Sequence, residues 1–386
     1  MTQEEASAAL RVRQQTLYAY VSRGRIEVCP DPTDSRRSLY RAEDIATLQR
    51  KRDLGRARDS IAASTMSWGE PIIATQISTI SHGRLYYRGH DAVTLAATAS
   101  LEEAARLLWV AEELPHFPTC AGVMVHDLPR AQAYAALGVA AAEGAPAHAL
   151  SPATMRHEAA CLVGRLASAF VDIAADATPL HLRVAKAWGC EERAELLCRV
   201  LVLLADQELT SSAFAARVTA STGASLGACA LTGLAALSGP LHGDATVRVQ
   251  ALLDEVQRAG AEVAVRRWLA AGLPLPGFGH QLYPEGDPRA ADLLGAFELS
   301  EGTRALVECA YRLTGLRPTI DVALAALVEH CRLPEGGAFA LFAIGRCVGW
   351  MAHAIEQIAT GTLLRPRARY VGALTVEAVG GGEGQA

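Results

Sequence analysis

Two histidines and one aspartate in the C-terminal half of the chain stand beside glycine or proline in three separate segments. His242 lies in the segment GPLHG, His280 ends the segment GFGH, and Asp321 ends the segment PTID. A carboxylate can remove a proton from a carbon next to a carbonyl group, and imidazoles can polarise or protonate the carbonyl oxygens. The three segments therefore predict acid–base chemistry on a carbonyl substrate.

Three arginines accompany these segments. Arg289 follows His280 in the sequence DPR, Arg346 lies in the sequence IGR, and Arg365 lies in the sequence RPR. A guanidinium group binds a carboxylate through two parallel hydrogen bonds. We therefore expect a small substrate that carries two carboxylates.

Each of these residues also has a structural interpretation. A single histidine is often a hydrogen-bonded core residue, and Asp321 could simply cap the helix that follows it. His353 and Glu356 lie one helical turn apart like a metal-binding pair, but no third ligand is evident in the sequence. We expect a structural polar contact there and no metal site.

The same segments, in the same order, resemble the citrate synthase family from about Ile73 to Gly372. The resemblance also includes GRLYYRGHD at residues 83–91, LADQE at 204–208 and GWMAHAIEQ at 349–357. One such motif alone is weakly specific, whereas the shared order and spacing extend over most of the chain. The resemblance implies a mainly α, citrate synthase-like two-domain helical fold that assembles as a homodimer.

The resemblance implies a reaction between acetyl-CoA and oxaloacetate. Asp321 would remove a proton from the acetyl methyl group, His242 would stabilise the enol, and His280 would polarise the ketone of oxaloacetate. Citryl-CoA would form, and water would then release CoA. No metal and no permanently bound cofactor is implied, since acetyl-CoA is a co-substrate and CoA a product.

The resemblance also assigns binding roles. The carboxylates of oxaloacetate would be held by Arg289, Arg346 and Arg365, and Arg365 would reach in from the partner subunit. The backbone that approaches the adenine of CoA would be that of Gly277, Phe278 and Gly279.

Several positions depart from the family pattern. Family members usually have a histidine that contacts oxaloacetate where this chain has Gln207, and a glutamine cannot carry positive charge. Thr210 and Thr319 stand where asparagine is usual, and Asp244 and Thr246 replace a common glycine and asparagine. These changes spare the acid–base residues but alter the substrate shell, so we expect a somewhat different substrate or weak activity.

The N-terminal segment differs from the rest in charge. Residues 1–58 carry twelve basic and eight acidic side chains, a net charge of +4, which leaves −9 for the remainder because the whole chain carries −5. An anionic partner fits this asymmetry. The pattern predicts a helix, a turn, a second helix from Gln14 to Arg23, a basic loop at residues 31–37, and a third helix from Asp44 to Arg52.

This segment resembles the winged helix-turn-helix domains of the MerR and excisionase type. In such domains the second helix enters the major groove of DNA and the wing touches phosphates. The residues expected to contact DNA are Arg13, Gln14, Gln15, Thr16, Tyr18, Arg36 and Arg37. The alternative is a module that only dimerises or docks, because such short motifs specify function loosely.

Composition favours a large helical enzyme. Of the 386 residues, 51% are apolar and only 5% aromatic, which favours closely packed helices over strands. Capping boxes are predicted where Thr2 precedes Glu5 and where Ser100 precedes Glu103. We expect a winged helix-turn-helix at residues 1–58, a large helical domain at 59–240 and 333–386, and a small helical domain at 241–332.

The cysteines and the apolar segments bear on location. Nine cysteines without a C-x-x-C pair argue against a zinc site or a disulfide framework and favour the cytoplasm. The acidic N-terminus is unlike a signal peptide. The uncharged stretch from Val218 to Leu241 is long enough to span a membrane, but polar residues dilute it, so we expect one buried helix and no membrane partner.

Two hypotheses from different classes follow. The first is an acyl-CoA condensing enzyme, a citrate or 2-methylcitrate synthase, which His242, His280 and Asp321 favour. The second is a DNA-binding regulator whose enzyme-like body senses CoA esters or dicarboxylates, which Gln207 and the basic N-terminal segment favour. The two functions can coexist in one chain.

Overall fold

A computed structural model describes residues 1–10, 12, 14–22, 24–31, 37–49, 73–120, 128–368 and 372. The chain divides into two units, Met1–Ala74 with Pro366–Ala386, and Thr75–Arg365. The predicted boundary at residue 58, Arg13, Arg36 and the end of the predicted third helix lie outside the described residues. The division of the body into a large and a small domain remains a proposal.

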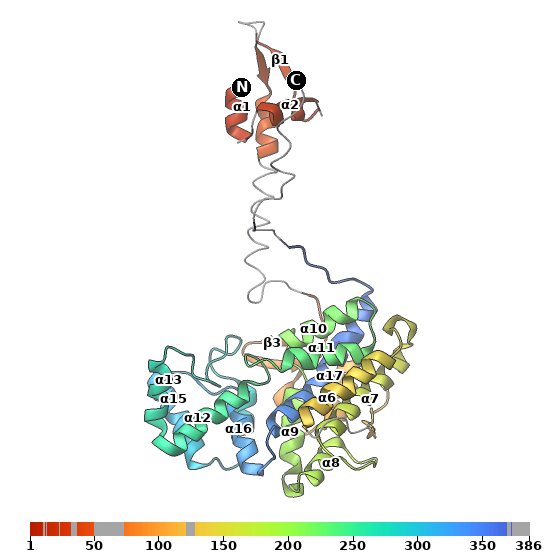
Figure 1. Cartoon of the computed structure of the whole chain (residues 1–386), viewed down its shortest axis with the longest axis vertical. Coiled ribbons are helices and arrows are strands. Elements are labelled where there is room, and N and C mark those ends of the chain that lie inside the picture. The colour runs from red at the N-terminus through yellow and green to blue at the C-terminus, as the bar shows by residue number, and fades with distance from the viewer. Residues whose placement is uncertain are drawn as a thin grey trace. The chain divides into compact units, whose positions relative to one another are not determined.

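Short helices and a β-hairpin form the described part of the first unit (Figure 1). Helix α1 spans Gln3–Leu10 and α2 spans Gln14–Ser22, while residues 42–49 are also helical. Strand β1 (Val28–Pro30) pairs antiparallel with β2 (Ser38–Tyr40). These elements share a small core made of Ala6, Leu10, Leu17, Ile26, Tyr40 and Ile45.

The second unit begins with a small sheet and continues as helices. Strands β3 (Ser78–Ser81), β4 (Arg84–Tyr87) and β5 (His90–Asp91) are antiparallel in that order. The α-helices that follow are α4 (Ala92–Ala96), α5 (Leu101–Trp109), α6 (Pro129–Glu143), α7 (Pro152–Phe170), α8 (Leu180–Ala187), α9 (Ala194–Leu204), α10 (Ser211–Ser221), α11 (Leu226–Leu237), α12 (Ala245–Ala259), α13 (Ala261–Ala270), α14 (Pro288–Leu294), α15 (Glu301–Thr314), α16 (Ile320–Cys331) and α17 (Gly337–Thr360). Two 3₁₀ turns, Ala147–Ala149 and Glu191–Arg193, complete the described elements. The prediction of a mainly α fold is therefore confirmed.

Helix α17 is the central element of the second unit (Figure 1). It contacts α5, α7, α9, α10, α11 and α16. Among the described residues, only this helix is long and apolar enough to cross a membrane, and 89% of its most apolar window is buried inside the protein. Its apolar surface is therefore matched by the helices packed around it.

The uncharged stretch from Val218 to Leu241 corrects one prediction. The sequence predicts a single buried helix there, whereas the structure ends α10 at Ser221 and starts α11 at Leu226. Gly223, between them, has φ +81°, a left-handed conformation that stops a helix and suits glycine. The two helices then pack against each other, as Figure 1 shows.

Buried side chains of the second unit form two clusters. The larger one surrounds α17 and includes residues from Ile77 to Ala354. The smaller one joins α12, α13, α15 and one face of α16, and all its buried members lie between Val249 and Ala325. These four helices gather on one side of the unit in Figure 1. Phe278 of this cluster lies two residues before His280, and Val322 of the cluster directly follows Asp321 on α16.

Candidate active site

A cavity of about 210 Å³ collects side chains from the three segments. His242 lies in the turn after α11, His280 lies in the loop before α14, and Asp321 lies in the first turn of α16. The loops are held together by the backbone, since Gly279 N–H donates to Arg317 O at 2.9 Å. The lining residues are Leu241, His242, Ala245, Gly277, Phe278, Gly279, His280, Arg289, Thr319, Ile320, Asp321 and Phe342.

Asp321 is a desolvated carboxylate at the start of a helix. Thr319 is the N-cap of α16, so the interpretation of Asp321 as the cap is wrong. The Thr319 hydroxyl also donates to Asp321 Oδ2 at 3.0 Å. Burial raises the pKa of Asp321 to about 6, although the Thr319 hydrogen bond and Arg289 act in the opposite direction. A carboxylate with this pKa is a competent base near neutral pH.

His242, which lines the same cavity, is held neutral by its surroundings. Its Nε2 lies 2.8 Å from Ser212 Oγ, and its ring packs edge-on against Phe342. Burial, and then the nearby positive charge of Arg346, lower the pKa of His242 to about 4. A neutral imidazole has one N–H, so His242 can donate one hydrogen bond and cannot act as a cation at pH 7.

Arg289 is buried and already paired. Its Nε donates to Asp287 Oδ1 at 3.0 Å, its Nη2 to Asp287 Oδ2 at 2.8 Å, and its Nη1 to Gln207 Oε1 at 2.8 Å. Burial opposes the charge of Asp287, but Arg289 and the hydrogen bonds outweigh it, so the pKa of Asp287 lies below its ordinary value. Asp287 also accepts from Ile320 N–H at 3.0 Å, which ties Arg289 to the start of α16.

Gln207 joins Arg289 to His280. It lies in the turn after α9 and is only 7% exposed. Its Nε2 is 3.3 Å from His280 Nε2, while Leu282 N–H donates to His280 Nδ1 at 3.1 Å. Burial, and then Arg289, lower the pKa of His280, so this ring is also neutral near pH 7.

Arg346 carries a buried donor with no partner. It lies on α17, where its Nε donates to Leu204 O at 2.8 Å and its Nη1 to Thr210 Oγ1 at 3.4 Å. Its Nη2 has no hydrogen-bond partner among the described residues. Burial lowers the pKa of Arg346 to about 10, so the group remains charged at neutral pH. A buried, charged N–H group without a partner fits an anion supplied by a ligand.

The glycines of the GFGH segment are required by the backbone. Gly277 and Gly279 both have φ +77°, which disfavours any side chain. A Cβ at Gly277 would also lie 2.6 Å from Val322 Cγ2 and 2.7 Å from Val249 Cγ2. The structure therefore explains both glycines by conformation and packing, in addition to the bare backbone that they present to the cavity.

Arg365 is not brought into the cavity by its own chain. It is exposed in the segment after α17, and it does not line the cavity. Of the residues expected to contact DNA, Gln14, Gln15, Thr16 and Tyr18 lie on α2 in the other unit, and Arg37 lies just before β2.

Some residues of the site are not evident from the sequence. Ser212 contacts His242, and Asp287 orients Arg289, yet neither stands in the chain where a catalytic partner would be sought. The DPR sequence points to Asp287 only as a helix N-cap before proline, which it also is.

The positions that depart from the family pattern have partners in the structure. Thr210 accepts from Arg346, and Thr319 caps α16. Asp244 accepts two hydrogen bonds from Arg130, at 3.2 and 2.7 Å, and Thr246 Oγ1 donates to Gly243 O at 3.2 Å. The contacts of Asp244 and Thr246 stabilise the turn that carries His242.

His353 and Glu356 each contact other side chains. Arg217 Nη1 donates to Glu356 Oε2 at 2.7 Å, and His353 Nε2 lies 3.3 Å from Asp206 Oδ1. Among the described residues, no three potential metal ligands come together. Because Asp206 precedes Gln207, this buried network supports the turn behind the cavity.

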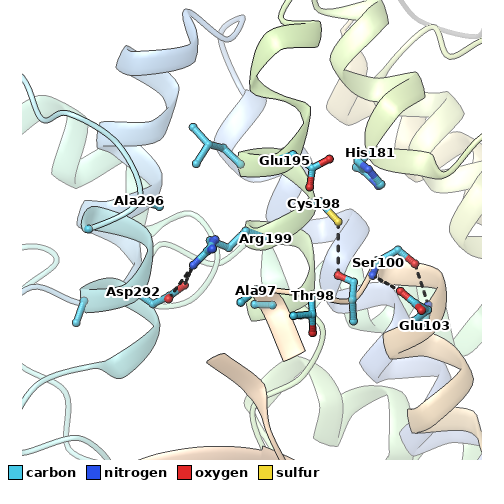
Figure 2. A pocket seen from close by; sticks show the side chains of 15 residues that line it. Ala97, Thr98, Ser100, Glu103, His181, Glu195, Cys198, Arg199, Asp292 and Ala296 are labelled. Carbon is cyan, nitrogen blue, oxygen red and sulfur yellow. Dashed lines mark hydrogen bonds and ion pairs between the residues drawn. The ribbon is translucent and has the colours of Figure 1, made fainter. Parts of the chain in front are cut away.

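A second cavity, of about 790 Å³, is larger but lacks this convergence (Figure 2). Some of its polar side chains pair with one another: Arg199 pairs with Asp292 at 2.9 Å, and Ser100 and Glu103 form the predicted capping box of α5. The thiol of Cys198 donates to Ala99 O, and burial raises its pKa to about 12. The smaller cavity is therefore the better site for acid–base chemistry.

Comparison with known proteins gives a consistent result. Residues 160–367 match the family model described as citrate synthase, C-terminal domain. The chain is 40% identical over 184 residues to putative citrate synthase 2 of Mycobacterium tuberculosis, which is 44% of this chain and 49% of that protein. The chain thus spans about half the length of that relative. It is 28% identical over 356 residues to citrate synthase 2 of Bacillus subtilis, which is 78% of this chain and 95% of that protein.

A solved structure shares the fold. The citrate synthase of Thermoplasma acidophilum, described as a ternary complex with carboxymethyl coenzyme A and oxaloacetate, aligns with a TM-score of 0.68 and 26% identity. The alignment covers 79% of this chain and 94% of that one.

Proposed function

The chain belongs to the citrate synthase family, and from this we propose that it condenses an acyl-CoA with oxaloacetate and releases CoA. Acetyl-CoA would give citrate, and propionyl-CoA would give 2-methylcitrate. One observation carries the proposal: a carboxyl group with a pKa of about 6 faces the same cavity as two neutral imidazoles. Proton abstraction next to a thioester needs this combination of a base and uncharged donors.

The proposed reaction begins at Asp321. Its carboxylate takes a proton from the carbon next to the thioester, and the thioester oxygen gains the electron pair. We propose that the Ser212 hydroxyl, 2.8 Å from Nε2 of His242, donates to that nitrogen; the ring hydrogen is then on Nδ1, from which His242 donates to the thioester oxygen. A neutral donor stabilises the enolate without trapping it as a tightly paired ion.

Carbon–carbon bond formation follows. The enolate carbon attacks the keto carbon of oxaloacetate, whose oxygen takes the C=O electron pair and then one proton. Water next attacks the thioester, so the products are a tricarboxylate and the free thiol of CoA. His280, which lines the cavity, would polarise the ketone.

Carboxylate binding would rest on arginines. The unpartnered Nη2 of Arg346 supports a role for this residue, while Arg289 offers a charge that Asp287 partly offsets. Arg365 is exposed after α17 and would serve the site of a partner subunit in a homodimer. The bound oxaloacetate and carboxymethyl coenzyme A named for the Thermoplasma acidophilum structure support this choice of substrates. Gly277, Phe278 and Gly279 would border CoA, and the enzyme would work in the cytoplasm.

Release of free thiol by the purified protein tests the proposal. We expect release from acetyl-CoA or propionyl-CoA only when oxaloacetate is present. Asp321→Ala should lower the rate by ~10²-fold or more, because a general base contributes about that much. Glu329→Gln, near the other end of α16, is the matched control and should keep the wild-type rate. Unchanged turnover in Asp321→Ala would exclude this residue as the base.

A second function is proposed for the first unit. Helix α2 buries Leu17 and leaves Tyr18 52% exposed, so one face packs on the core and the other is open. An open helix face next to a β-hairpin supports binding of DNA in the major groove. We propose that Gln14, Gln15, Thr16, Tyr18 and Arg37 contact DNA, together with Arg13 and Arg36 outside the described residues.

A further inference from the structure

The orientation of the Gln207 amide is set by chemistry. Arg289 Nη1 lies 2.8 Å from Gln207 Oε1. A guanidinium group has only donors, so the amide atom facing Arg289 must be the oxygen. The amide nitrogen therefore faces His280, where it lies 3.3 Å from Nε2 of the imidazole.

The tautomer of His280 is constrained from the other side of the ring. Leu282 N–H donates to His280 Nδ1 at 3.1 Å, so Nδ1 carries no hydrogen. In a neutral ring the hydrogen is then on Nε2, which faces the amide nitrogen of Gln207. Two N–H donors thus lie 3.3 Å apart, and neither can accept a hydrogen bond from the other. In the other tautomer the hydrogen is on Nδ1 and opposes Leu282 N–H instead. In the protonated ring both nitrogens carry a hydrogen, so His280 would oppose both Leu282 N–H and the Gln207 amide.

The neighbouring tyrosine does not remove this conflict. Tyr283 is buried, and its ring lies 4.9 Å from that of His280. Burial raises the pKa of Tyr283 to about 12, while its interaction with Gln207 acts in the opposite direction. The amide carries two hydrogens, so a hydrogen bond from one of them to the Tyr283 hydroxyl leaves the other for a further acceptor.

A ligand oxygen resolves the arrangement. An acceptor about 2.9 Å from both nitrogens would satisfy the two donors at once. The ketone oxygen of a 2-oxo acid is such an acceptor, and it gains negative charge as the new carbon–carbon bond forms. Fixed N–H donors aimed at developing charge stabilise a transition state strongly.

We propose that the Gln207 amide N–H and the His280 Nε2–H form a two-donor site for the ketone oxygen of the 2-oxo acid. This inference rests on the proposed condensation and makes Gln207 a catalytic residue, not a ligand of a carboxylate. The amide does not titrate between pH 5 and pH 9, so its donor is present throughout the working range, unlike that of an imidazole.

The sharpest variant is Gln207→Glu. A carboxylate of the same shape accepts from both Arg289 and His280 Nε2–H, so it satisfies the buried groups but removes the donor. We expect a melting temperature at or above that of the wild type, an unchanged KM for the acyl-CoA, and a kcat for CoA release lowered by ~10²-fold or more. If Gln207 only positioned Arg289, Glu would do so at least as well, and a retained kcat would overturn the inference.

Ligand binding separates this inference from the proposed reaction. Calorimetric titration compares oxaloacetate with succinate, which has both carboxylates but no ketone oxygen, on the wild type and on Gln207→Leu. We expect the variant to lose about tenfold more affinity for oxaloacetate than for succinate, the effect of about one hydrogen bond. Equal losses for both ligands would assign Gln207 to a carboxylate and overturn the inference. A wild type that shows the selectivity but releases no CoA would instead refute the condensation and leave the two-donor site standing.

Discussion

At Asp321 the demands of folding and of proton abstraction oppose each other. The pKa of this carboxyl is about 6 in the folded chain, because burial outweighs the Thr319 hydrogen bond, against an ordinary value of 3.8. Between these two values the folded state holds a proton that the unfolded state has lost. The free energy of unfolding therefore falls as the pH rises through this window, and the whole penalty remains above about pH 6.

Removing the charge of Asp321 should restore the free energy of unfolding that its burial costs. Two pKa units correspond to about 3 kcal/mol at most, so Asp321→Asn should raise the free energy of unfolding by about 1–3 kcal/mol at pH 8. At pH 4 the gain should be much smaller, since the carboxyl of the wild type is then protonated. Urea denaturation of both proteins at the two pH values checks this, and CoA release should be lost in the variant. An equal change in stability at both pH values would contradict the raised pKa.

Asp176 provides a control of opposite sign. Hydrogen bonds from Thr178 hold the pKa of this exposed carboxyl below its ordinary value. Its charge is therefore favoured in the folded state above the unfolded pKa and loses that benefit as the pH falls. Asp176→Asn should then slightly destabilise the protein at pH 8, where Asp321→Asn stabilises it.

At the scale of elements, the position of Gln207 depends on how closely α17 approaches α9. Gly345 and Gly349 lie four residues apart on the same side of α17. A Cβ at Gly345 would lie 2.8 Å from Leu201 O, and one at Gly349 would lie 2.5 Å from Asp206 Oδ1 and closer still to Ala205 O. Small residues at this spacing let two backbones come together, and the turn that follows α9 carries Gln207.

Gly349→Ala should disturb both stability and the site. The added methyl group meets backbone of α9 that cannot move without repacking, so we expect a loss of roughly 1–3 kcal/mol in the free energy of unfolding. A lower kcat/KM should accompany it, because the shift reaches Asp206 and Gln207. Gly302→Ala on α15 is the control: its Cβ would meet Val256 only at 4.0 Å, and a helical alanine should stabilise by about 0.5–1 kcal/mol. Equal stability of Gly349→Ala and the wild type would show that α17 and α9 can accommodate the added methyl group, which would contradict the prediction.

Helix starts that depend on residues close in sequence could be predicted, whereas features that depend on long-range contacts or on one backbone conformation could not. Both predicted capping boxes exist, at Thr2 with Glu5 and at Ser100 with Glu103, because each depends on residues three positions apart. The break near Gly223 was missed, because apolar composition is the same in one helix or in two and only the left-handed glycine separates them.

The site shows the same limit. The segments around His242, His280 and Asp321 could be identified because glycine and proline mark them in the chain. Ser212 and Asp287 could not be assigned roles, because they act through partners brought close only by the fold, His242 and Arg289. The buried state of Arg289 likewise depends on Gln207, 82 positions earlier in the chain.

At the scale of the whole molecule, the two units have separate interiors. Among the described residues, the core of the first unit is made of side chains between Ala6 and Leu48, whereas the residues that line the candidate active site, and the Gln207 and Ser212 side chains that contact its histidines, all belong to the second unit. The first unit therefore has a core of its own, and the proposed reaction uses none of its residues.

Deletion of residues 1–58 tests this independence. The truncated protein should release CoA at nearly the full rate and lose all DNA binding, as measured by thiol release and by gel shift with fragmented genomic DNA. In the full chain, DNA binding should fall steeply between about 50 and 200 mM salt, because basic side chains displace counterions from phosphates. Tyr18→Ala, which removes an exposed side chain of α2, should weaken DNA binding and leave CoA release unchanged. Absence of any shift with the full chain at low salt would refute the DNA-binding proposal. A truncated protein that folds but has lost catalysis would instead make the first unit a structural part of the enzyme.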